Sequence, residues 1–278
     1  MKFIPIQSNF LYPEITAKHY RFGSGKIVGT ILREDGDWRD YVPEGELQNK
    51  RGIESSACYV EAQQHTIATI QEEQFNLVDQ NYSARFNALL SNGTPYGGSP
   101  LEAGDSIRHD GLVKDSSMPF GDDIKSWQDF HSFQGVDEAS VRAEGLMWLR
   151  EWTPYYDIVF EMDEPLEIKA QRIRDALKYS PVCISVAGWY QDNSGIYIKP
   201  EGVRDNHLVE CVHVDEDGYY YVFDTYEPFL KKLHPLYNPE FAMRWTLDRN
   251  KKKDNLWSKF IKWFFTQKWI IRILRRSQ

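Results

Sequence analysis

Apolar residues recur with two different periods along this chain, a helical period at first and strict alternation in the last third. From residue 55 to residue 75 they return every three or four positions, which predicts a helix that Ser55 or Ser56 would cap. The same period predicts helices over residues 99–109 and 164–178. Gly111 is a suitable stop signal for the second of these.

Alternation of apolar and polar positions predicts strands over residues 182–187, 207–214 and 219–224. The sequence DEDG at residues 215–218 separates the last two and predicts a hairpin turn. A helix-rich first part and a strand-rich last part favour an α+β fold.

Other segments are less regular. Residues 1–42 mix aromatic, charged and turn residues and predict an N-terminal arm laid across the domain, with a strand over residues 25–34. An inhibitory role for this arm is one alternative. Residues 76–98 predict a loop, and residues 120–160 predict an insertion or lobe junction with a short helix.

Three residues in this pattern suggest nucleophilic catalysis. Cys58 falls in the first turn of a predicted helix, where the helix dipole favours a thiolate. His207 starts one predicted strand and Asp224 ends another. A thiol, an imidazole that accepts its proton, and a third polar group that orients the imidazole form a nucleophile for acyl transfer. Each residue alone is more often structural, so the prediction rests on the three together.

The surrounding motifs resemble those of the papain-like cysteine peptidases. They are Gln48 before the Cys58–Tyr59 pair, the segment YGGSPLEAGDSIRHDGLV, SPVCISVAGWY, and NHLVECVHVDEDGYYYVFDTYEP. The resemblance covers roughly residues 43–248. It implies a two-lobed fold, with a helical N-terminal lobe, a β-rich C-terminal lobe and the active site between them.

The resemblance also implies roles for single residues. Gln48 would donate to an oxyanion, although the long loop before Cys58 leaves Asn49 as an alternative. Gly97 and Gly98 would let a substrate backbone approach, or form an ordinary turn. The remaining residues expected at the cleft are Leu208, Trp189 and Tyr226, of which the two aromatic residues are equally suited to core packing.

Asp224 departs from the family pattern, in which Asn is usual. A carboxylate favours an imidazolium more strongly than an amide does, and we expect Asp224→Asn to keep activity. The sequence DWRDYVPEGELQ at residues 37–48 is most similar to phage-encoded members of the family.

Composition narrows the setting. Three cysteines cannot form a conventional disulfide framework, which favours a reducing compartment or a short-lived extracellular role. The first residues show no secretory signal, and we expect a cytoplasmic or virion-associated protein. We expect no metal site, because the other histidines lack ligand spacing, and no cofactor.

Charge is spread unevenly. The net charge is −8, but residues 251–278 hold nine Lys or Arg and one Asp, so the rest carries about −16. Residues 249–278 predict a basic amphipathic C-terminal helix that packs on its own domain, lies on a membrane surface or docks on a partner protein. Nucleic acid is disfavoured by the acidic body.

A cysteine peptidase acting on peptide or protein substrates is the leading hypothesis. The alternatives are a catalytically inactive binding module with the same cleft, a cell-wall amidase, and a transglutaminase-like acyl transferase.

Overall fold

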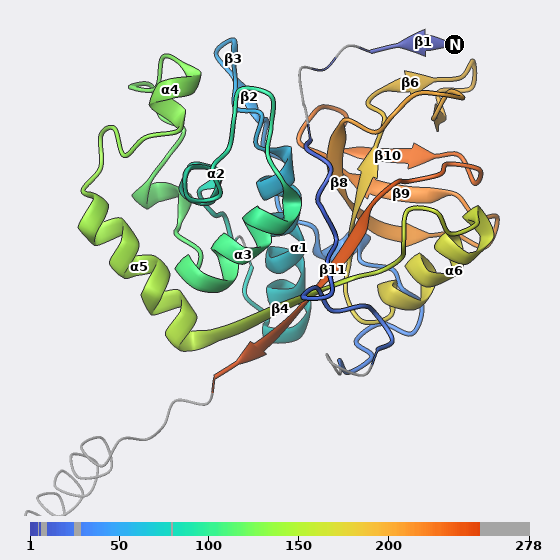
Figure 1. The fold of residues 1–278 in the computed structure, drawn as a ribbon, viewed down its shortest axis with the longest axis horizontal. Helices are drawn as coiled ribbons and strands as arrows, with labels where there is room; N and C mark the ends of the chain where they lie inside the picture. Colours follow the sequence, from blue (N-terminus) through green and yellow to red (C-terminus); the bar gives the residue numbers. More distant parts are fainter. Residues whose placement is uncertain (5, 7–9, 25–28, 79, 251–278) are drawn as a thin grey trace, which may run out of the picture. The chain divides into compact units, whose positions relative to one another are not determined.

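The helix that begins at Cys58 lies in the middle of the molecule, with helices on one side and a large sheet on the other (Figure 1). The structure, a computed structural model, describes residues 1–250 except residues 5, 7–9, 25–28 and 79. Residues 1–248 form one compact unit. The predicted tail belongs to a second unit, and residues 251–278 lie outside the described residues, so its predicted helix and partners stay predictions.

Six α-helices are found in the described residues. They are α1 (Cys58–Phe75), α2 (Ala84–Leu90), α3 (Pro100–Asp110), α4 (Trp127–Phe130), α5 (Glu138–Glu151) and α6 (Leu166–Leu177). The predicted helices at 99–109 and 164–178 are therefore confirmed. Short 3₁₀ helices, η1 (Arg39–Tyr41) and η2 (Asp115–Ser117), accompany them.

Helix α1 begins three residues later than predicted. Ser56 has a left-handed backbone with φ of 54°, so the chain is not yet helical there. Ala57 is the N-cap and makes no side-chain capping bond. Ser55 instead accepts a hydrogen bond from the Ala57 N–H at 3.2 Å, so the predicted serine cap is wrong.

Helix α2 lies inside the segment that the sequence predicts as a loop. Its polar residues Arg85 and Asn87 are buried, which hides the usual amphipathic pattern. The Arg85 guanidinium donates to backbone carbonyls, among them Pro119 at 2.6 Å, and Asn87 Nδ2 donates to Gly111 O at 3.1 Å. Buried polar groups with such partners are stable in a core, and only the structure reveals those partners.

Gly111 ends α3 as predicted, with φ of 81° and its N–H bonded to Ile107 O. A Cβ at this position would lie 2.0 Å from the backbone oxygen of Gly145 in α5. The residue therefore serves both the helix end and the close approach of α5.

Nine strands of the described residues form one sheet, in the order β1-β6-β7-β10-β9-β8-β5-β11-β4. They are β1 (Lys2–Phe3), β4 (Trp152–Ile158), β5 (Val182–Val186), β6 (Tyr190–Gln191), β7 (Tyr197–Ile198), β8 (His207–Val214), β9 (Tyr220–Phe223), β10 (Leu230–Leu233) and β11 (Ala242–Arg249). Strands β2 (Asn49–Lys50) and β3 (Ile53–Glu54) form a separate hairpin. The predicted strands at 182–187, 207–214 and 219–224 and the DEDG hairpin are confirmed. No strand is found in residues 29–34, the described part of the strand predicted at 25–34.

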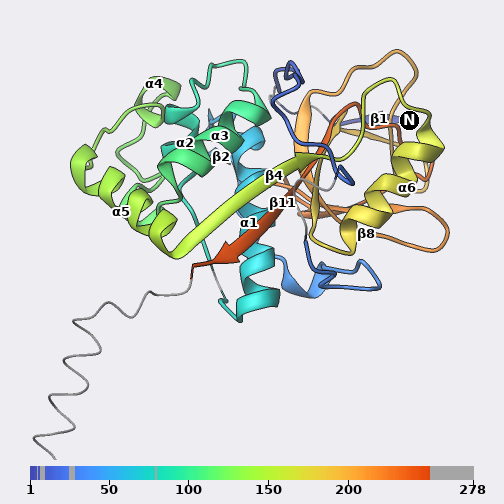
Figure 2. The ribbon, with the colours of Figure 1, turned by 60° about the horizontal axis from the view of Figure 1, so that its bottom comes forward.

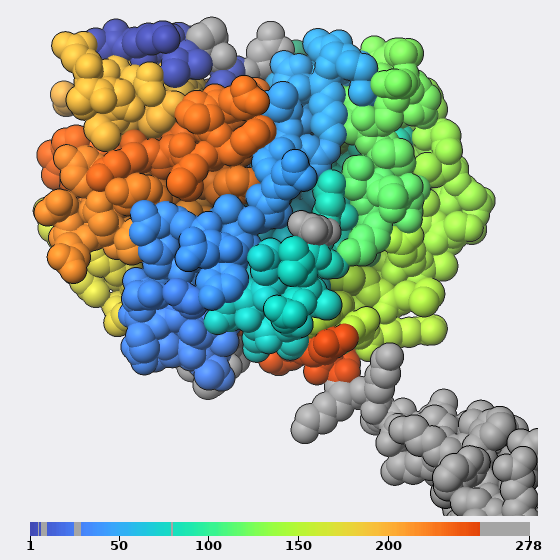
Figure 3. Space-filling view, turned by 180° about the vertical axis from the view of Figure 1, so that it is seen from behind, coloured from blue at the N-terminus to red at the C-terminus, as the bar shows by residue number. Residues whose placement is uncertain are grey.

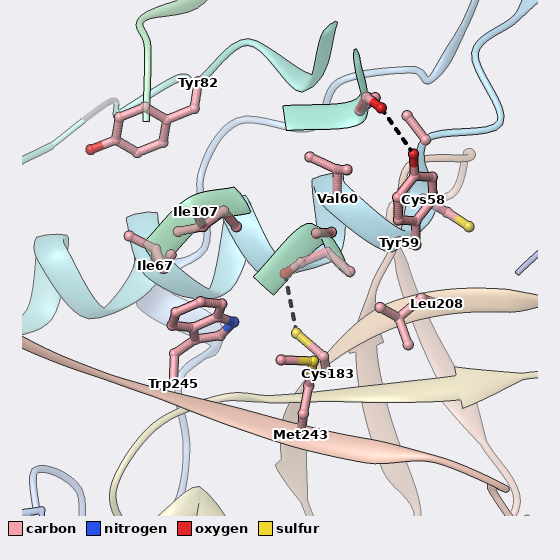
Figure 4. Close-up of a cluster of buried hydrophobic side chains, with 14 of the residues drawn as sticks. Cys58, Tyr59, Val60, Ile67, Tyr82, Ile107, Cys183, Leu208, Met243 and Trp245 are labelled. Carbon is pink, nitrogen blue, oxygen red and sulfur yellow. Dashed lines mark hydrogen bonds between the residues drawn. The ribbon is translucent and has the colours of Figure 1, made fainter. Parts of the chain in front are cut away.

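Strands β4 and β11 extend from the C-terminal lobe along α1 into the N-terminal lobe (Figures 1 and 2). Trp152, Tyr156, Met243 and Trp245 of these strands belong to the same buried cluster as Cys58 and Tyr59 of α1 (Figure 4). A second cluster fills the space between α6 and the sheet. The two lobes therefore share a sheet as well as a core.

Candidate active site

Cys58 is the first residue of α1, with its side chain at the junction of the two lobes and no exposed surface. Leu208, one residue after His207 on β8, lies beside it in the same cluster (Figure 4). The first backbone N–H groups of a helix have no partner inside the helix, and the dipole there favours negative charge. The position thus suits a thiolate.

His207 opens β8 and is also fully buried. Its Nε2 donates to Asp224 Oδ1 at 2.6 Å, and its ring forms a second hydrogen bond with the Cys58 side chain. Because Nε2 is occupied by Asp224, Nδ1 is the nitrogen left for the sulfur. Burial opposes the charged ring, but Asp224 and Cys58 outweigh it and raise the pKa of His207 to about 10.

Asp224 directly follows β9 and receives hydrogen bonds on both oxygens. Trp189 Nε1 donates to Oδ2 at 2.9 Å, and Lys231 Nζ donates to the same atom at 2.6 Å. Burial favours a neutral carboxyl, but the charges of His207 and Lys231 outweigh it and hold the pKa of Asp224 below its ordinary value. The structure therefore brings Cys58, His207 and Asp224 together as expected from their order.

Lys231, on β10, is the partner that the sequence pattern did not indicate. Its side chain is 1% exposed, and Nζ also donates to Pro228 O at 2.7 Å. Burial lowers the pKa of Lys231, while Asp224 acts in the opposite direction. The carboxylate that replaces the usual amide thus has a buried cation beside it.

Gln48 is fully buried on the segment that leads to Cys58. Its Oε1 accepts from Thr225 Oγ1 at 2.7 Å, and its Nε2 donates to Glu54 Oε1 at 2.5 Å. Asn49 instead lies in the β2–β3 hairpin, opposite Glu54. Of the two candidate donors, Gln48 is therefore the one bonded to the residue after Asp224. Figure 3 shows this segment from behind (blue), between the strands (orange) and the helices (green).

Gly98 lies against both α1 and the N-terminal arm. A Cβ there would come within 2.3 Å of the Tyr59 ring, so no larger residue fits. Its backbone oxygen accepts from the Leu11 N–H at 3.1 Å, and Phe10 pairs with it as an isolated parallel bridge. Gly97, with φ of 92°, closes a turn with Thr94.

Trp189 and Tyr226 both pack against the His207 ring. The Trp189 ring contacts His207 edge-on at 5.9 Å between centroids and bonds Asp224. The Tyr226 ring lies 5.6 Å from the His207 ring, and its hydroxyl donates to Glu54 Oε2 at 2.6 Å. Trp189 is 1% exposed, so it packs around the His207–Asp224 pair and does not line an open cleft.

The N-terminal arm passes between the two lobes in both ribbon views (Figures 1 and 2). Its first strand, β1, pairs with β6, and Ile4 exchanges two backbone hydrogen bonds with Trp189. Ile6 packs at Gly188, next to His207. Further along, the Tyr12 hydroxyl donates to Asp205 O at 2.9 Å and to Glu240. The arm therefore contacts both lobes on either side of the Cys58–His207 pair.

Within the described residues, no three His, Cys, Asp or Glu side chains gather as metal ligands would. No helix of the same residues is long and apolar enough to cross a membrane.

No family model and no curated protein sequence matches the chain. Solved structures do. Xylellain, a cysteine protease from Xylella fastidiosa, has a TM-score of 0.60 at 14% identity and covers 88% of this chain and 97% of its own. Bromelain from Ananas comosus, in complex with the E64 inhibitor, has a TM-score of 0.53 at 18% identity, and the match covers 76% of this chain and 98% of the bromelain chain.

A digestive procathepsin L 3 of Tenebrio molitor has a TM-score of 0.54 at 14% identity, over 81% of this chain and 73% of its own. The chain thus has the two-lobed fold of papain-like cysteine proteases, as the motifs predict. At such low identity the likeness establishes the fold, and the chemistry depends on the residues described above.

Proposed function

We propose that the chain is a cysteine peptidase that hydrolyses peptide bonds through Cys58, His207 and Asp224. The observation that supports this is the buried relay in which His207 bonds Cys58 on one side and Asp224 at 2.6 Å on the other. Acyl transfer needs this combination of a thiol, a proton acceptor and an orienting group.

The reaction would start with the Cys58 thiolate adding to the carbonyl carbon of the substrate, which forms a C–S bond and an oxyanion. The backbone N–H of Cys58 and Nε2 of Gln48 would stabilise that oxyanion. When the adduct collapses, the C–N bond breaks and His207 gives its proton to the leaving amine. Water then attacks the thioester, His207 takes its proton, and the carboxylic acid and free thiol are released.

The N-terminal arm would compete with substrate for this cleft. Cys58 and His207 have no exposed surface, and the arm bonds Gly98 and Trp189 on the two lobes. Substrate would reach the thiol only after the arm leaves. The arm would thereby slow access to Cys58, and an electrophile would reach the thiol during transient opening of the arm.

The direct test is mass spectrometry after brief treatment with a mild epoxide electrophile, on the wild type and on His207→Ala. We expect single labelling of Cys58 in the wild type, strongly reduced in the variant. Equal labelling of all three cysteines in both proteins would contradict the proposal and favour the inactive binding module.

A further inference from the structure

Glu54 ends the short β2–β3 hairpin, four residues before Cys58. Its carboxylate accepts hydrogen bonds from three donors: Gln48 Nε2 at 2.5 Å, Ser56 N at 2.9 Å and Tyr226 OH at 2.6 Å. An ionised carboxylate only accepts, so all three partners must present a hydrogen to it.

The first consequence concerns the Gln48 amide. An amide can bind in two orientations that exchange its oxygen and nitrogen. Because Glu54 accepts only and the Thr225 hydroxyl donates to Oε1, the amide is held with Nε2 toward Glu54. One N–H of Nε2 binds Glu54, and the other remains for an oxyanion.

The second consequence concerns the backbone that enters α1. Ser56 adopts the left-handed region, with φ of 54°, which a residue with a side chain seldom adopts without support. Glu54 binds its N–H, and the Ser56 hydroxyl donates to Pro95 O at 3.0 Å. These bonds fix the turn that aims the Cys58 N–H.

The third consequence concerns the cover over the imidazole. Tyr226 lies against the His207 ring, and its hydroxyl is held by Glu54. Burial, and next the charge of the Glu54 carboxylate, raise the pKa of Tyr226 far above its ordinary range. The phenol therefore stays protonated and donates its hydrogen. One side chain thus connects both expected oxyanion donors with the residue that packs on His207.

We infer that Glu54 is a positioning residue of the acyl-transfer site, which sets the orientation of the Gln48 amide and of the Cys58 N–H. The inference rests on the proposed function. Glu54 does not touch the reacting atoms and does not activate the thiol. Its loss therefore slows reactions that develop an oxyanion and spares reactions of the thiolate that do not.

The test compares two small reagents on the full chain. With p-nitrophenyl acetate, the thiolate adds to the ester carbonyl and nitrophenolate leaves, so an oxyanion develops. With iodoacetamide, the sulfur displaces iodide and no oxyanion forms. The variant Glu54→Gln keeps the shape but can donate as well as accept, so it no longer selects one amide orientation. Glu46→Gln is the matched control, because Glu46 lies on the same segment and binds Lys50 instead.

We expect Glu54→Gln to lower the acetylation rate of Cys58 about 10- to 100-fold, while its alkylation rate stays within about threefold of the wild type. Glu46→Gln should leave both rates unchanged. An unchanged ratio of the two rates in Glu54→Gln would overturn the inference. If Glu54→Gln fails to fold, Tyr226→Phe removes one of the three donors and should lower the same ratio severalfold, with no change counting against the inference. A Cys58 that resists alkylation both in the wild type and in Leu11→Pro, which removes the hydrogen bond of the arm to Gly98 O, would instead refute the proposed function.

Discussion

Two regions of the molecule bury cysteine, and they surround it with different polar groups. Cys58, Cys183 and Cys211 all have no exposed surface. Cys58 lies between the lobes with a histidine bonded to it. Cys183 lies within the sheet, where Thr66 Oγ1 at 3.2 Å and Ala62 O at 3.5 Å are its polar neighbours (Figure 4).

Burial raises the pKa of the Cys183 thiol far above its ordinary value, and raises that of Cys211 to about 12. Neither has a cation beside it in its contacts with the described residues, so burial leaves both thiols protonated and unreactive. The comparison teaches that burial alone does not distinguish a structural thiol from a candidate nucleophile. The charged groups buried next to the thiol make that distinction.

The largest expected effect is that of Cys58→Ala, which should abolish labelling by the epoxide. Cys183→Ala and Cys211→Ala should leave the labelling rate unchanged, because those thiols stay protonated. The measurement is intact-protein mass spectrometry over time. Persistent labelling of Cys58→Ala at Cys183 or Cys211 would break the distinction between the two regions.

A large effect on stability is expected at Asp224. The sequence predicts that Asp224→Asn keeps activity, and Lys231 adds an expected cost in stability, because the substitution leaves a buried cation without its counter-charge. We expect a loss of about 3–5 kcal/mol in the free energy of unfolding, measured by urea denaturation. Asp224→Asn combined with Lys231→Met should recover most of it and keep Cys58 reactive. A double variant no more stable than the single one would show that Lys231 does not compensate the charge.

A moderate effect is expected from the arm. Leu11→Pro removes the N–H that binds Gly98 O, and we expect it to raise the epoxide labelling rate of Cys58 about tenfold or less. Leu11→Ala is the matched control, since it keeps the N–H and changes only a side chain that is 44% exposed. Equal rates in the two variants would mean that this contact does not limit access.

The smallest effect is a dependence of stability on pH. The pKa of His207 is raised from 6.5 to about 10, so its contribution is fully present below pH 6.5 and is lost as the pH rises toward 10. The pKa of Asp224 is lowered from 3.8, so its contribution is present above that value and is lost as the pH falls below it. The difference in unfolding free energy between wild type and His207→Ala should therefore be largest between about pH 4 and 6.5 and decline above it. If the difference in unfolding free energy between the two proteins grew from pH 7 to pH 9, the raised pKa of His207 would be contradicted.

Many helices and strands could be predicted from the sequence, because local periodicity sets them, whereas the two-lobed fold and the grouping of Cys58, His207 and Asp224 are predicted from the resemblance to papain-like peptidases. The partners could not be predicted in either way. Lys231 lies in the strand LKKL, whose two adjacent lysines break the apolar–polar alternation, so the sequence does not say which lysine points inward. Glu54 reaches the site only because the β2–β3 hairpin folds back, and that hairpin depends on left-handed turns at Arg51 and Gly52. Such contacts depend on which way a strand residue faces or on unusual backbone angles, and the periodicity of the sequence indicates neither.

The strands β4 and β11 add a kinetic consequence. Since they run through both lobes within one sheet, separating the lobes would break backbone hydrogen bonds and expose the shared core. Access to Cys58 should then be governed by how often the arm lifts away. At high electrophile concentration the labelling rate should stop rising and level off at a constant, first-order value. That plateau would measure the opening frequency of the arm itself.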